Sequence, residues 1–489
     1  MQTIENQAVR EWARGWMNTT RGGFVDGAWL EGGTPLASIN PDHGREQAHF
    51  HATTDQQIEQ AVEAANRAFA TWSGLTRKER AARLRAVGEV VRSHRAELAT
   101  LESLDTGKTF PEAFEDDLPD SADIFDYYAG WVDKLYGESC PVEEGFVNFT
   151  RHEPLGVCAQ IIPWNFPLLM ACWKLAPALA MGNTVIIKPS EHTCMSLVRL
   201  FELLDGVLPA GVLNLVLGDG KVGDALCRHS QVHKVAFTGS TAVGRKILHA
   251  AADSNLKPVS LELGGKSPVV IFEDVDLTAC LDRCFPAMFS HKGEKCSEPT
   301  RFLIHRKLYA AAIEDLVARA EAVVCGDPFD PQTQQGPQCH REHFERVLEY
   351  IELGKKEGAR LVAGGGRPQL EGFFVRPTIF ADVTSEMRIF QEEIFGPVLC
   401  LTPFDDEEEA IALANASTYG LAAGVYTRDV SRAHRVANRL EAGMVFVNRY
   451  GCYDFASPFG GFKQSGWGKE MAIHSLASYT RLKSIWIAL

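Results

Sequence analysis

The feature that most constrains the fold of this 489-residue chain is a regular alternation of short apolar runs with amphipathic segments. Runs of strand length occupy residues 157–162, 184–187, 212–216 and 234–237. Helical stretches separate them at 168–180 and 195–204, and the pattern restarts after Glu262 with strands at 269–272 and 302–305 and helices at 308–323 and 343–354. Such alternation is typical of a parallel, doubly wound sheet. Because one core rarely grows to this length, the sequence predicts two α/β domains.

Two amphipathic helices are predicted ahead of the first of these strands. A capping-box pattern opens each of them, with Thr54 and Gln57 at the start of 54–72 and Thr76 and Glu79 at the start of 76–101. In a capping box, the side chains of the two residues accept hydrogen bonds from each other's backbone N–H groups. The apolar residues of both segments then repeat at helical spacing, which indicates one buried face for each helix.

Charge and cysteine usage exclude several classes of protein. The chain has 49 Lys and Arg against 63 Asp and Glu, and its formal net charge of −14 repels phosphate backbones and anionic lipid surfaces. Residues 1–16 contain no apolar run suited to a signal peptide or a membrane span. We therefore expect a cytoplasmic protein without nucleic-acid or membrane partners. The 12 cysteines show no CxxC spacing, so we expect reduced thiols and no metal site.

Cys296 and Glu262 form a candidate nucleophile and base. Cys296 follows Gly293-Glu294-Lys295, and Glu262 lies in the segment 261–268, LELGGKSP. A thiolate is a strong nucleophile near neutral pH, and a carboxylate can activate either the thiol or a water that resolves a covalent intermediate. The pair indicates attack on a carbonyl. Taken alone, however, two such residues are more often a buried small side chain and a strand-end charge.

A third motif favours the catalytic interpretation of Cys296 and Glu262. In residues 161–167, IIPWNFP, the amide of Asn165 lies between two prolines and two aromatic residues, in position to donate to an oxyanion. Four further segments follow in a fixed order, namely 188–191 (KPSE), 237–240 (FTGS), 392–397 (EEIFGP) and 457–466 (SPFGGFKQSG). With the thiol, the carboxylate and the amide, nearly the whole chain resembles the hydrolytic, NAD(P)-dependent branch of the aldehyde dehydrogenase superfamily.

This resemblance implies two doubly wound, Rossmann-like α/β domains and a small β oligomerisation element. The NAD-binding domain would comprise 1–131 and 152–263, the catalytic domain 264–462, and the oligomerisation element 132–151 with 463–489. The apolar and β-branched residues near 135–151 would otherwise form an exposed strand edge, which proteins avoid by pairing. We therefore expect a homodimer or a homotetramer.

The resemblance also implies the chemical roles for the oxidation of an aldehyde to its acid. Cys296 would attack the aldehyde carbon, and Asn165 with the backbone N–H of Cys296 would stabilise the oxyanion. After hydride transfer to NAD, Glu262 would activate water to hydrolyse the thioester. Its presence argues against the acylating branch, which transfers the acyl group to coenzyme A. Lys174 and Glu470 would carry the proton outward, or they form an ordinary ion pair.

A candidate cofactor site follows the strand that ends near Phe237. Small residues between Thr238 and Gly244 join the strand to a helix and let a phosphate approach the backbone. The spacing is G-x-x-x-x-G rather than G-x-G-x-x-G, so the resemblance carries the assignment of NAD. The residues implied in binding NAD are Ile162, Trp164, Lys188, Glu191, Gly220, Gly223, Phe237, Gly239, Ser240, Val243, Leu263, Glu393 and Phe395. The Glu191 carboxylate would repel a 2′-phosphate and favour NAD over NADP, although Lys188 tolerates either cofactor.

The positions that match the substrate tunnel of the family are mostly aromatic or apolar. They are Phe166, Leu169, Met170, Trp173, Ser290, Tyr453 and Phe459. Phe166, Ser290 and Phe459 replace the Tyr, Trp and Trp of betaine-aldehyde members, so the cation–π cage is incomplete and Ser290 widens the tunnel. The tunnel therefore predicts a medium-chain or aryl aldehyde as the small-molecule substrate.

Other readings remain open at this point. Arg449 is suited to the carboxylate of an acidic semialdehyde, and an ω-amino aldehyde is a further alternative. A non-catalytic binding or structural protein of the same fold, or a thiol esterase, would need no aldehyde oxidation.

One position departs from the family pattern. Gly293-Glu294-Lys295-Cys296 replaces the commoner Gly-Gln-x-Cys. A carboxylate aimed at the thiol would raise the pKa of Cys296 and weaken the nucleophile. We therefore expect the side chain of Glu294 to point away from Cys296.

Overall fold

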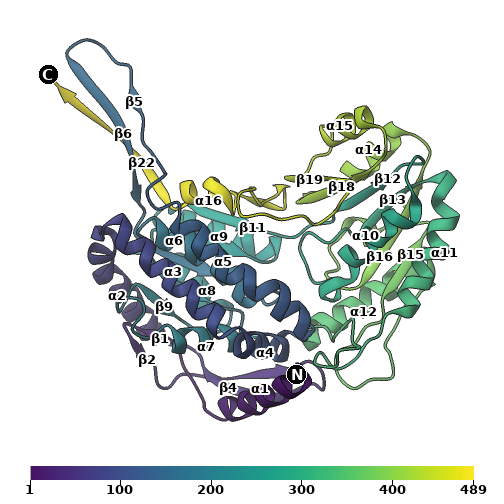
Figure 1. Ribbon diagram of the computed structural model, residues 1–489, viewed down its shortest axis with the longest axis horizontal. Coiled ribbons are helices and arrows are strands. Elements are labelled where there is room, and N and C mark those ends of the chain that lie inside the picture. The colour runs from purple at the N-terminus through teal and green to yellow at the C-terminus, as the bar shows by residue number, and fades with distance from the viewer. Residues whose placement is uncertain (1) are drawn as a thin grey trace.

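The computed structural model describes residues 2–489 of the chain. Figure 1 shows two α/β lobes beside each other and a narrow β arm that projects from the first lobe and carries the C-terminus. The fold class predicted from the sequence is confirmed, since each lobe is built on a largely parallel sheet covered by helices.

The first lobe contains an eight-stranded sheet of order β2-β1-β9-β8-β7-β10-β11-β21. Its five central strands, from β9 to β11, are parallel, and the remaining strands run antiparallel to their neighbours. The strands are β1 (Phe24–Val25), β2 (Ala28–Trp29), β7 (Val157–Ile161), β8 (Thr184–Lys188), β9 (Leu213–Leu215), β10 (Lys234–Thr238), β11 (Val259–Glu262) and β21 (Gly466–Trp467). The helices are α1 (Gln2–Met17), α2 (Asp55–Gly74), α3 (Arg77–Ser93), α4 (Arg95–Thr106), α5 (Leu118–Ala129), α6 (Pro167–Ala180), α7 (Met195–Leu203), α8 (Gly220–Arg228), α9 (Thr241–Asp253) and α16 (Ala472–Ser478).

The second lobe contains a seven-stranded sheet of order β14-β15-β16-β13-β12-β18-β19, in which only β14 is antiparallel. The strands are β12 (Pro268–Ile271), β13 (Arg301–His305), β14 (Arg360–Ala363), β15 (Thr378–Ala381), β16 (Val398–Phe404), β18 (Ala422–Tyr426) and β19 (Met444–Val447). The helices are α10 (Leu277–Phe289), α11 (Arg306–Ala322), α12 (Arg341–Lys356), α13 (Arg388–Gln391), α14 (Glu407–Asn415) and α15 (Val430–Ala437). Two small antiparallel strand pairs, β3 (Pro35–Asn40) with β4 (Arg45–His51) and β17 (Tyr419–Gly420) with β20 (Phe462–Lys463), complete the lobes.

Burial on both faces explains the continuous apolar runs of the central strands. Every residue of β7, β8 and β10 is buried. Alternate residues of β7 belong to different cores: Val157, Ala159 and Ile161 pack with residues of α2, α8 and α9, whereas Cys158 packs with residues of α6 and α7. A parallel sheet covered on both faces requires such runs rather than an apolar–polar alternation. The strands at 157–162, 184–187, 212–216 and 234–237 are thus present with small shifts at their ends.

The two N-terminal capping boxes are present, but one helix prediction was wrong. Thr54 with Gln57 caps α2, and Thr76 with Glu79 caps α3. The segment 76–101 is two helices rather than one, because His94 leaves the helical conformation (φ −111°, ψ 23°) and separates α3 from α4. Neither a glycine nor a proline marks this break, and the apolar spacing continues across it, so the sequence pattern concealed it.

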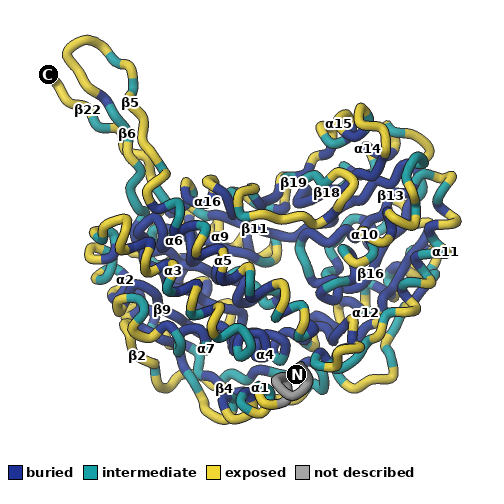
Figure 2. Tube along the Cα trace, in the orientation of Figure 1, coloured by how far each residue is buried: buried dark blue, intermediate teal, exposed yellow. Residues whose placement is uncertain are grey.

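The β arm consists of β5 (Ser139–Cys140), β6 (Phe146–Pro154) and β22 (Thr480–Ala488). β6 and β22 pair antiparallel from Phe146↔Ala488 to Pro154↔Thr480. Figure 2 shows that most of the arm is exposed, and the apolar side chains of Leu482 and Trp486 are each 60% exposed. β21 of the same C-terminal region lies outside the arm and pairs with β11 in the first sheet.

No helix within residues 2–489 is long and apolar enough to cross a membrane.

Most of the candidate site lies at the carboxyl ends of the parallel strands. Thr238 ends β10 and Glu262 ends β11, and the loop after β7 carries residues 162–166. Ligands of open α/β sheets bind outside these strand ends.

Candidate active site

A cavity of about 710 Å³ brings together side chains from both lobes. Of the predicted catalytic residues, Asn165, Glu262, Cys296 and Glu470 line it. Of the predicted cofactor residues, Trp164, Gly239, Ser240, Leu263, Glu393 and Phe395 line it, and so do all seven predicted tunnel residues, Phe166, Leu169, Met170, Trp173, Ser290, Tyr453 and Phe459. Three segments far apart in sequence, which carry the thiol, the carboxylate and the amide, therefore meet around one space.

The remaining predicted residues lie outside the lining of this cavity. They are Lys174, Ile162, Lys188, Glu191, Gly220, Gly223, Phe237 and Val243. Most of them belong to the strand ends and helix starts of the first lobe. Gly220 begins α8, a Cβ added at Gly223 would contact Ile161 and Lys188, and Val243 lies in the first turn of α9.

Glu262 is a buried carboxylate at the end of β11. Its side chain is 4% exposed, and its backbone carbonyl accepts a hydrogen bond from Gly239 N–H at 3.0 Å. Burial raises the pKa of Glu262 well above its ordinary value, and the carboxylate of Glu470 raises it further, while Lys174 and Lys469 oppose the shift. A raised pKa makes the ionised carboxylate a stronger base than an ordinary glutamate, which suits a general base.

Gly460 lies directly against this carboxylate. Its φ is +143°, and a Cβ there would come within 2.7 Å of Glu262 Oε1. The glycine in the segment 457–466 therefore leaves room for the Glu262 side chain.

Behind Glu262 lies a buried polar network. Lys174 Nζ donates to Thr238 Oγ1 at 2.6 Å and forms an ion pair with Glu470. Lys174 is fully buried, while Glu470 reaches the cavity wall. Lys174 and Glu470 therefore form the ion pair that the sequence analysis gave as one alternative, and Glu470 faces the space beside Glu262.

Cys296 lies between the turn Ser290–Gly293 and strand β13. Its backbone carbonyl is so close to Gly265 that a Cβ there would approach it to 2.3 Å. Burial raises the pKa of the Cys296 thiol, and the carboxylates of Glu393, Glu262 and Glu298 raise it further. A raised pKa favours the protonated thiol near neutral pH, so Cys296 would need a base to act as a nucleophile.

Asn165 is held in the loop that precedes α6. Its side-chain Nδ2 donates to the backbone carbonyl of Glu294 at 2.7 Å, and its backbone carbonyl lies 2.7 Å from His291 Nε2. One N–H of the Asn165 amide thus donates a hydrogen bond to the segment that carries Cys296. The second N–H of the same NH₂ group remains available to a ligand in the cavity.

The residues predicted to bind the cofactor include a helix start and three charged side chains. Ser240 caps α9, and its hydroxyl accepts the N–H of Val243 at 3.3 Å. Lys188 Nζ lies 3.6 Å from Glu191 Oε2, and burial lowers the pKa of Lys188 while Glu191 opposes the shift. Glu393 accepts a hydrogen bond from Gly265 N–H at 2.9 Å, and burial raises its pKa to about 7.

Comparison with known proteins identifies the family. A model described as "Aldehyde dehydrogenase family" matches residues 29–485. An aldehyde dehydrogenase of Aspergillus niger is 44% identical over 467 residues, which cover 94% of this chain and 94% of that protein. Retinaldehyde dehydrogenase 3 of Mus musculus is 43% identical over 473 residues, which cover 95% of this chain and 92% of that protein.

The chain belongs to the aldehyde dehydrogenase family. Among solved structures, the NAD⁺ complex of an aldehyde dehydrogenase from Bacillus cereus superposes with a TM-score of 0.95 at 43% identity, over 97% of this chain and 98% of that one. The resemblance read from the motifs is therefore confirmed.

The position that departs from the family motif is turned away from the thiol. Glu294 is fully buried, its Oε1 accepts the backbone N–H of Cys339 at 3.0 Å, and its Oε2 lies 2.8 Å from Lys292 Nζ. Glu294 does not line the cavity that holds Cys296. The expectation drawn from the sequence agrees with this geometry.

Several residues that line the cavity of this aldehyde dehydrogenase were missed in the sequence. His340, His343 and Arg346 come from the start of α12, and Lys295 and Glu112 lie along the predicted tunnel. The lining of the cavity is therefore less apolar than the aromatic residues of the predicted tunnel suggest. A histidine or arginine early in a helix is common, so the sequence carried no signal that set these residues apart.

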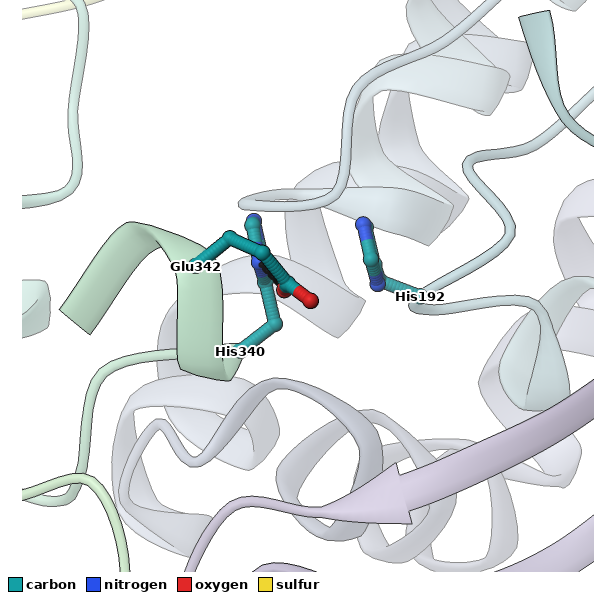
Figure 3. A group of neighbouring side chains, drawn as sticks. All are labelled: His192, His340 and Glu342. Atoms are coloured by element: carbon teal, nitrogen blue, oxygen red, sulfur yellow. Dashed lines mark hydrogen bonds and ion pairs between the residues drawn. The ribbon is translucent and has the colours of Figure 1, made fainter. Parts of the chain in front are cut away.

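His192, His340 and Glu342 form a compact group beside this part of the cavity, with ligand-type atoms within 4.8 Å of one another (Figure 3). The two imidazole rings are stacked, with centroids 3.9 Å apart and planes inclined by 2°. A metal ion must lie near the plane of each ring that binds it, because the nitrogen lone pair is in that plane. Parallel stacked rings cannot share one ion without rotating, so the observed geometry favours ring packing over metal binding.

The environment of Cys296 predicts the pH dependence of its alkylation. In the ligand-free enzyme, the rate of iodoacetamide modification should still rise with pH above about 9, because a thiol with a raised pKa forms thiolate only there. Peptide mass spectrometry would follow Cys296, with the exposed Cys452 as internal reference. Glu393→Gln, which removes the carboxylate with the largest effect on the thiol, should move the curve to lower pH. A wild-type rate that levels off below pH 9 would contradict the prediction.

Proposed function

We propose that this protein is an NAD-dependent aldehyde dehydrogenase that oxidises an aldehyde to a carboxylic acid through a thioester on Cys296. The observation that carries the proposal is the convergence of Cys296, Glu262 and Asn165 on one cavity that also opens onto the cofactor residues Glu393 and Phe395. A non-catalytic protein of the same fold would not need to preserve this set.

The residues present fit NAD. The first turn of α9 offers backbone N–H groups at a helix N-terminus, where Val243 is 40% exposed, so that an anionic pyrophosphate can approach. The Glu191 carboxylate can accept hydrogen bonds from ribose hydroxyls. Trp164 and Phe395 form an edge-to-face aromatic pair with ring centroids 5.2 Å apart. When bound, NAD supplies the hydride acceptor.

The first chemical step is addition of the Cys296 sulfur to the aldehyde carbon. A base must take the thiol proton for this attack; Glu262 is assigned instead to the later activation of water, which its raised pKa suits. The free N–H of Asn165 and the backbone N–H of Cys296 would donate to the oxygen that becomes negative. An oxyanion donor of this type contributes about 2.7–4 kcal/mol of transition-state stabilisation.

Loss of a hydride from this adduct, which bound NAD would accept, would leave a thioester on Cys296. The next step is hydrolysis of that thioester. Glu262 removes a proton from water, the hydroxide oxygen bonds to the acyl carbon, and the carbon–sulfur bond breaks to release the acid and the thiol. Glu470 faces the same space and is joined to Lys174, so this pair would pass the proton away from Glu262.

The tunnel favours a medium-chain or aryl aldehyde. The rings of Trp173 and Phe459 pack edge to face with centroids 5.3 Å apart, and the Tyr453 and Phe459 ring centroids are 5.9 Å apart. A flat or flexible apolar group of the substrate can therefore pack against aromatic side chains. A second cavity of about 620 Å³, lined by Ser290, Lys295, Tyr453, Arg283 and Arg449, adjoins this region. Its arginines favour an acidic semialdehyde as the alternative substrate.

The remaining assignments concern organisation. We assign NAD binding to 1–131 and 152–263, catalysis to 264–462, and association of subunits to 132–151 and 463–489. The exposed apolar residues of β22 support pairing of the β arm with another subunit in a homodimer or homotetramer. A cytoplasmic location agrees with a mechanism that needs a reduced thiol.

Stopped-flow measurements of NADH formation test the mechanism. Cys296→Ala should abolish NADH production while NAD binding persists, because only the covalent bond is lost. Glu262→Gln should release up to roughly one NADH per active site and then stall, because the thioester is not hydrolysed. An unchanged steady-state rate in Glu262→Gln, or the absence of any burst, would assign Glu262 a different role.

Cofactor preference should follow the charge of Glu191. The wild type is expected to show a higher kcat/KM with NAD than with NADP, and Glu191→Gln should narrow the difference by removing repulsion of the 2′-phosphate. Initial rates with both cofactors measure the effect, and Asp219→Asn, at the N-cap of α8, serves as a charge control. Equal wild-type efficiencies would mean that Lys188 dominates the site.

Substrate preference should follow the size of residue 290. Benzaldehyde or a medium-chain aldehyde should have a higher kcat/KM than betaine aldehyde, and Ser290→Trp should lower kcat/KM for the bulky substrates at least about tenfold, or roughly 1.4 kcal/mol. Ser290→Ala keeps the space and is the matched control. Preference for an acidic semialdehyde, lost selectively in Arg449→Ala, would support the alternative substrate instead.

A further inference from the structure

Three consecutive residues before the nucleophile have left-handed backbone conformations. His291, Lys292 and Gly293 have φ values of 52°, 61° and 73°. Only the glycine adopts this region without cost, and a non-glycine residue held there stores about 1–3 kcal/mol of strain. The surrounding structure must therefore hold this turn in place. The conformation of the turn then determines the position of Cys296.

His291 is fixed on the tunnel side of the turn. Its backbone N–H donates to Glu112 Oε1 at 2.6 Å, and its Nε2 lies 2.7 Å from the backbone carbonyl of Asn165. The imidazole stacks on Phe166, with centroids 4.1 Å apart and planes 6° from parallel. These contacts join the turn to the loop that carries Asn165.

Lys292 and Glu294 fix the opposite side of the turn. Both side chains are completely buried, and Lys292 Nζ lies 2.8 Å from Glu294 Oε2. Lys292 Nζ also donates to the backbone carbonyl of Thr106 at 2.6 Å, and Glu294 Oε1 accepts the N–H of Cys339. The pair thus links the turn to the end of α4 and to the segment that leads into α12, where cofactor-side residues of the cavity begin.

The backbone of Glu294 completes the connection. Its N–H donates to the carbonyl of His291 at 3.0 Å, which closes the turn, and its carbonyl accepts Nδ2 of Asn165 at 2.7 Å. Any movement of residue 294 therefore moves the carbonyl that orients the amide. Cys296 is only two residues further along the chain.

We propose that the buried Lys292–Glu294 ion pair is a positioning element of the active site, which holds the strained turn and so aims Asn165 and Cys296 at the same point. The proposal rests on the catalytic roles proposed above for those two residues. It gives the departure from the commoner Gly-Gln-x-Cys a structural reason, because a carboxylate at 294 neutralises a lysine at 292 that is buried at the base of the turn.

The energetics of the pair lead to an asymmetric expectation. A buried carboxylate left without its cation is strongly unfavourable, whereas removal of both charges together is often nearly neutral. Lys292→Met leaves the Glu294 carboxylate buried without its cation. Adding Glu294→Gln removes that negative charge, while the amide oxygen of the new side chain can still accept the hydrogen bond from the Cys339 N–H. The double variant should therefore recover what the single Lys292→Met variant loses.

The test measures the rate constant of the NADH burst with saturating NAD and benzaldehyde, together with the Tm and NAD affinity of each variant. Lys292→Met should slow the burst at least about tenfold with little change in NAD affinity, and Lys292→Met/Glu294→Gln should restore most of the lost rate. A purely structural role would lower the Tm without changing the burst of the folded enzyme, and that result would overturn the proposal.

A second cycle shows whether the pair acts through Asn165. In the Asn165→Ala background, Lys292→Met should cause little further loss, because the amide that it displaces is already absent. An equal loss in both backgrounds would refute positioning through Asn165. Should Lys292→Met fail to fold, Glu294→Ala, which also breaks the pair, is measured in both backgrounds with the same criteria. A normal burst in Asn165→Ala alone would instead refute the oxyanion role in the proposed function.

Discussion

Three of the buried lysines near the cavity are paired with carboxylates that are themselves buried. Lys108 pairs with Glu102 and Asp117, Lys174 with Glu470, and Lys292 with Glu294. An ammonium group in the interior is strongly unfavourable unless it is paired and hydrogen-bonded, so the positions of its partners are tightly restricted.

The buried pairs matter because each contacts a segment that carries a group with a proposed catalytic or binding role. Lys108 Nζ lies 4.6 Å from the centre of the Phe166 ring, which adjoins Asn165. Lys174 reaches Thr238 at the end of β10, and Lys292 lies in the turn before Cys296. The cavity is therefore fixed by electrostatic requirements as well as by apolar packing, and disturbing one pair affects the alignment of groups on separate elements.

Much of the fold and of the cavity was predictable, and the exceptions have identifiable physical causes. Strands such as β7 and β10 are buried on both faces, so their composition alone identifies them. β21 has two residues and no periodicity of its own, and it exists because it pairs with β11. In the cavity, residues inside distinctive motifs were found, while His343 and Lys295 were missed because their orientation depends on tertiary packing rather than on local sequence.

The same burial that orders the cavity opposes the chemistry proposed for it. The carboxylates of Glu393, Glu262 and Glu298 all raise the pKa of the Cys296 thiol, so the resting sulfur is protonated. Two of them belong to the proposed functional set, since Glu393 faces the cofactor side and Glu262 is the proposed base. A resting thiol of this kind resists oxidation and adventitious alkylation, because both reactions require the thiolate. It becomes nucleophilic when its proton passes to a neighbouring base or when a ligand offsets the charge of these carboxylates. On the proposed mechanism, reactivity would therefore be restricted to a cavity that holds substrate, where the second N–H of Asn165 would also find an acceptor.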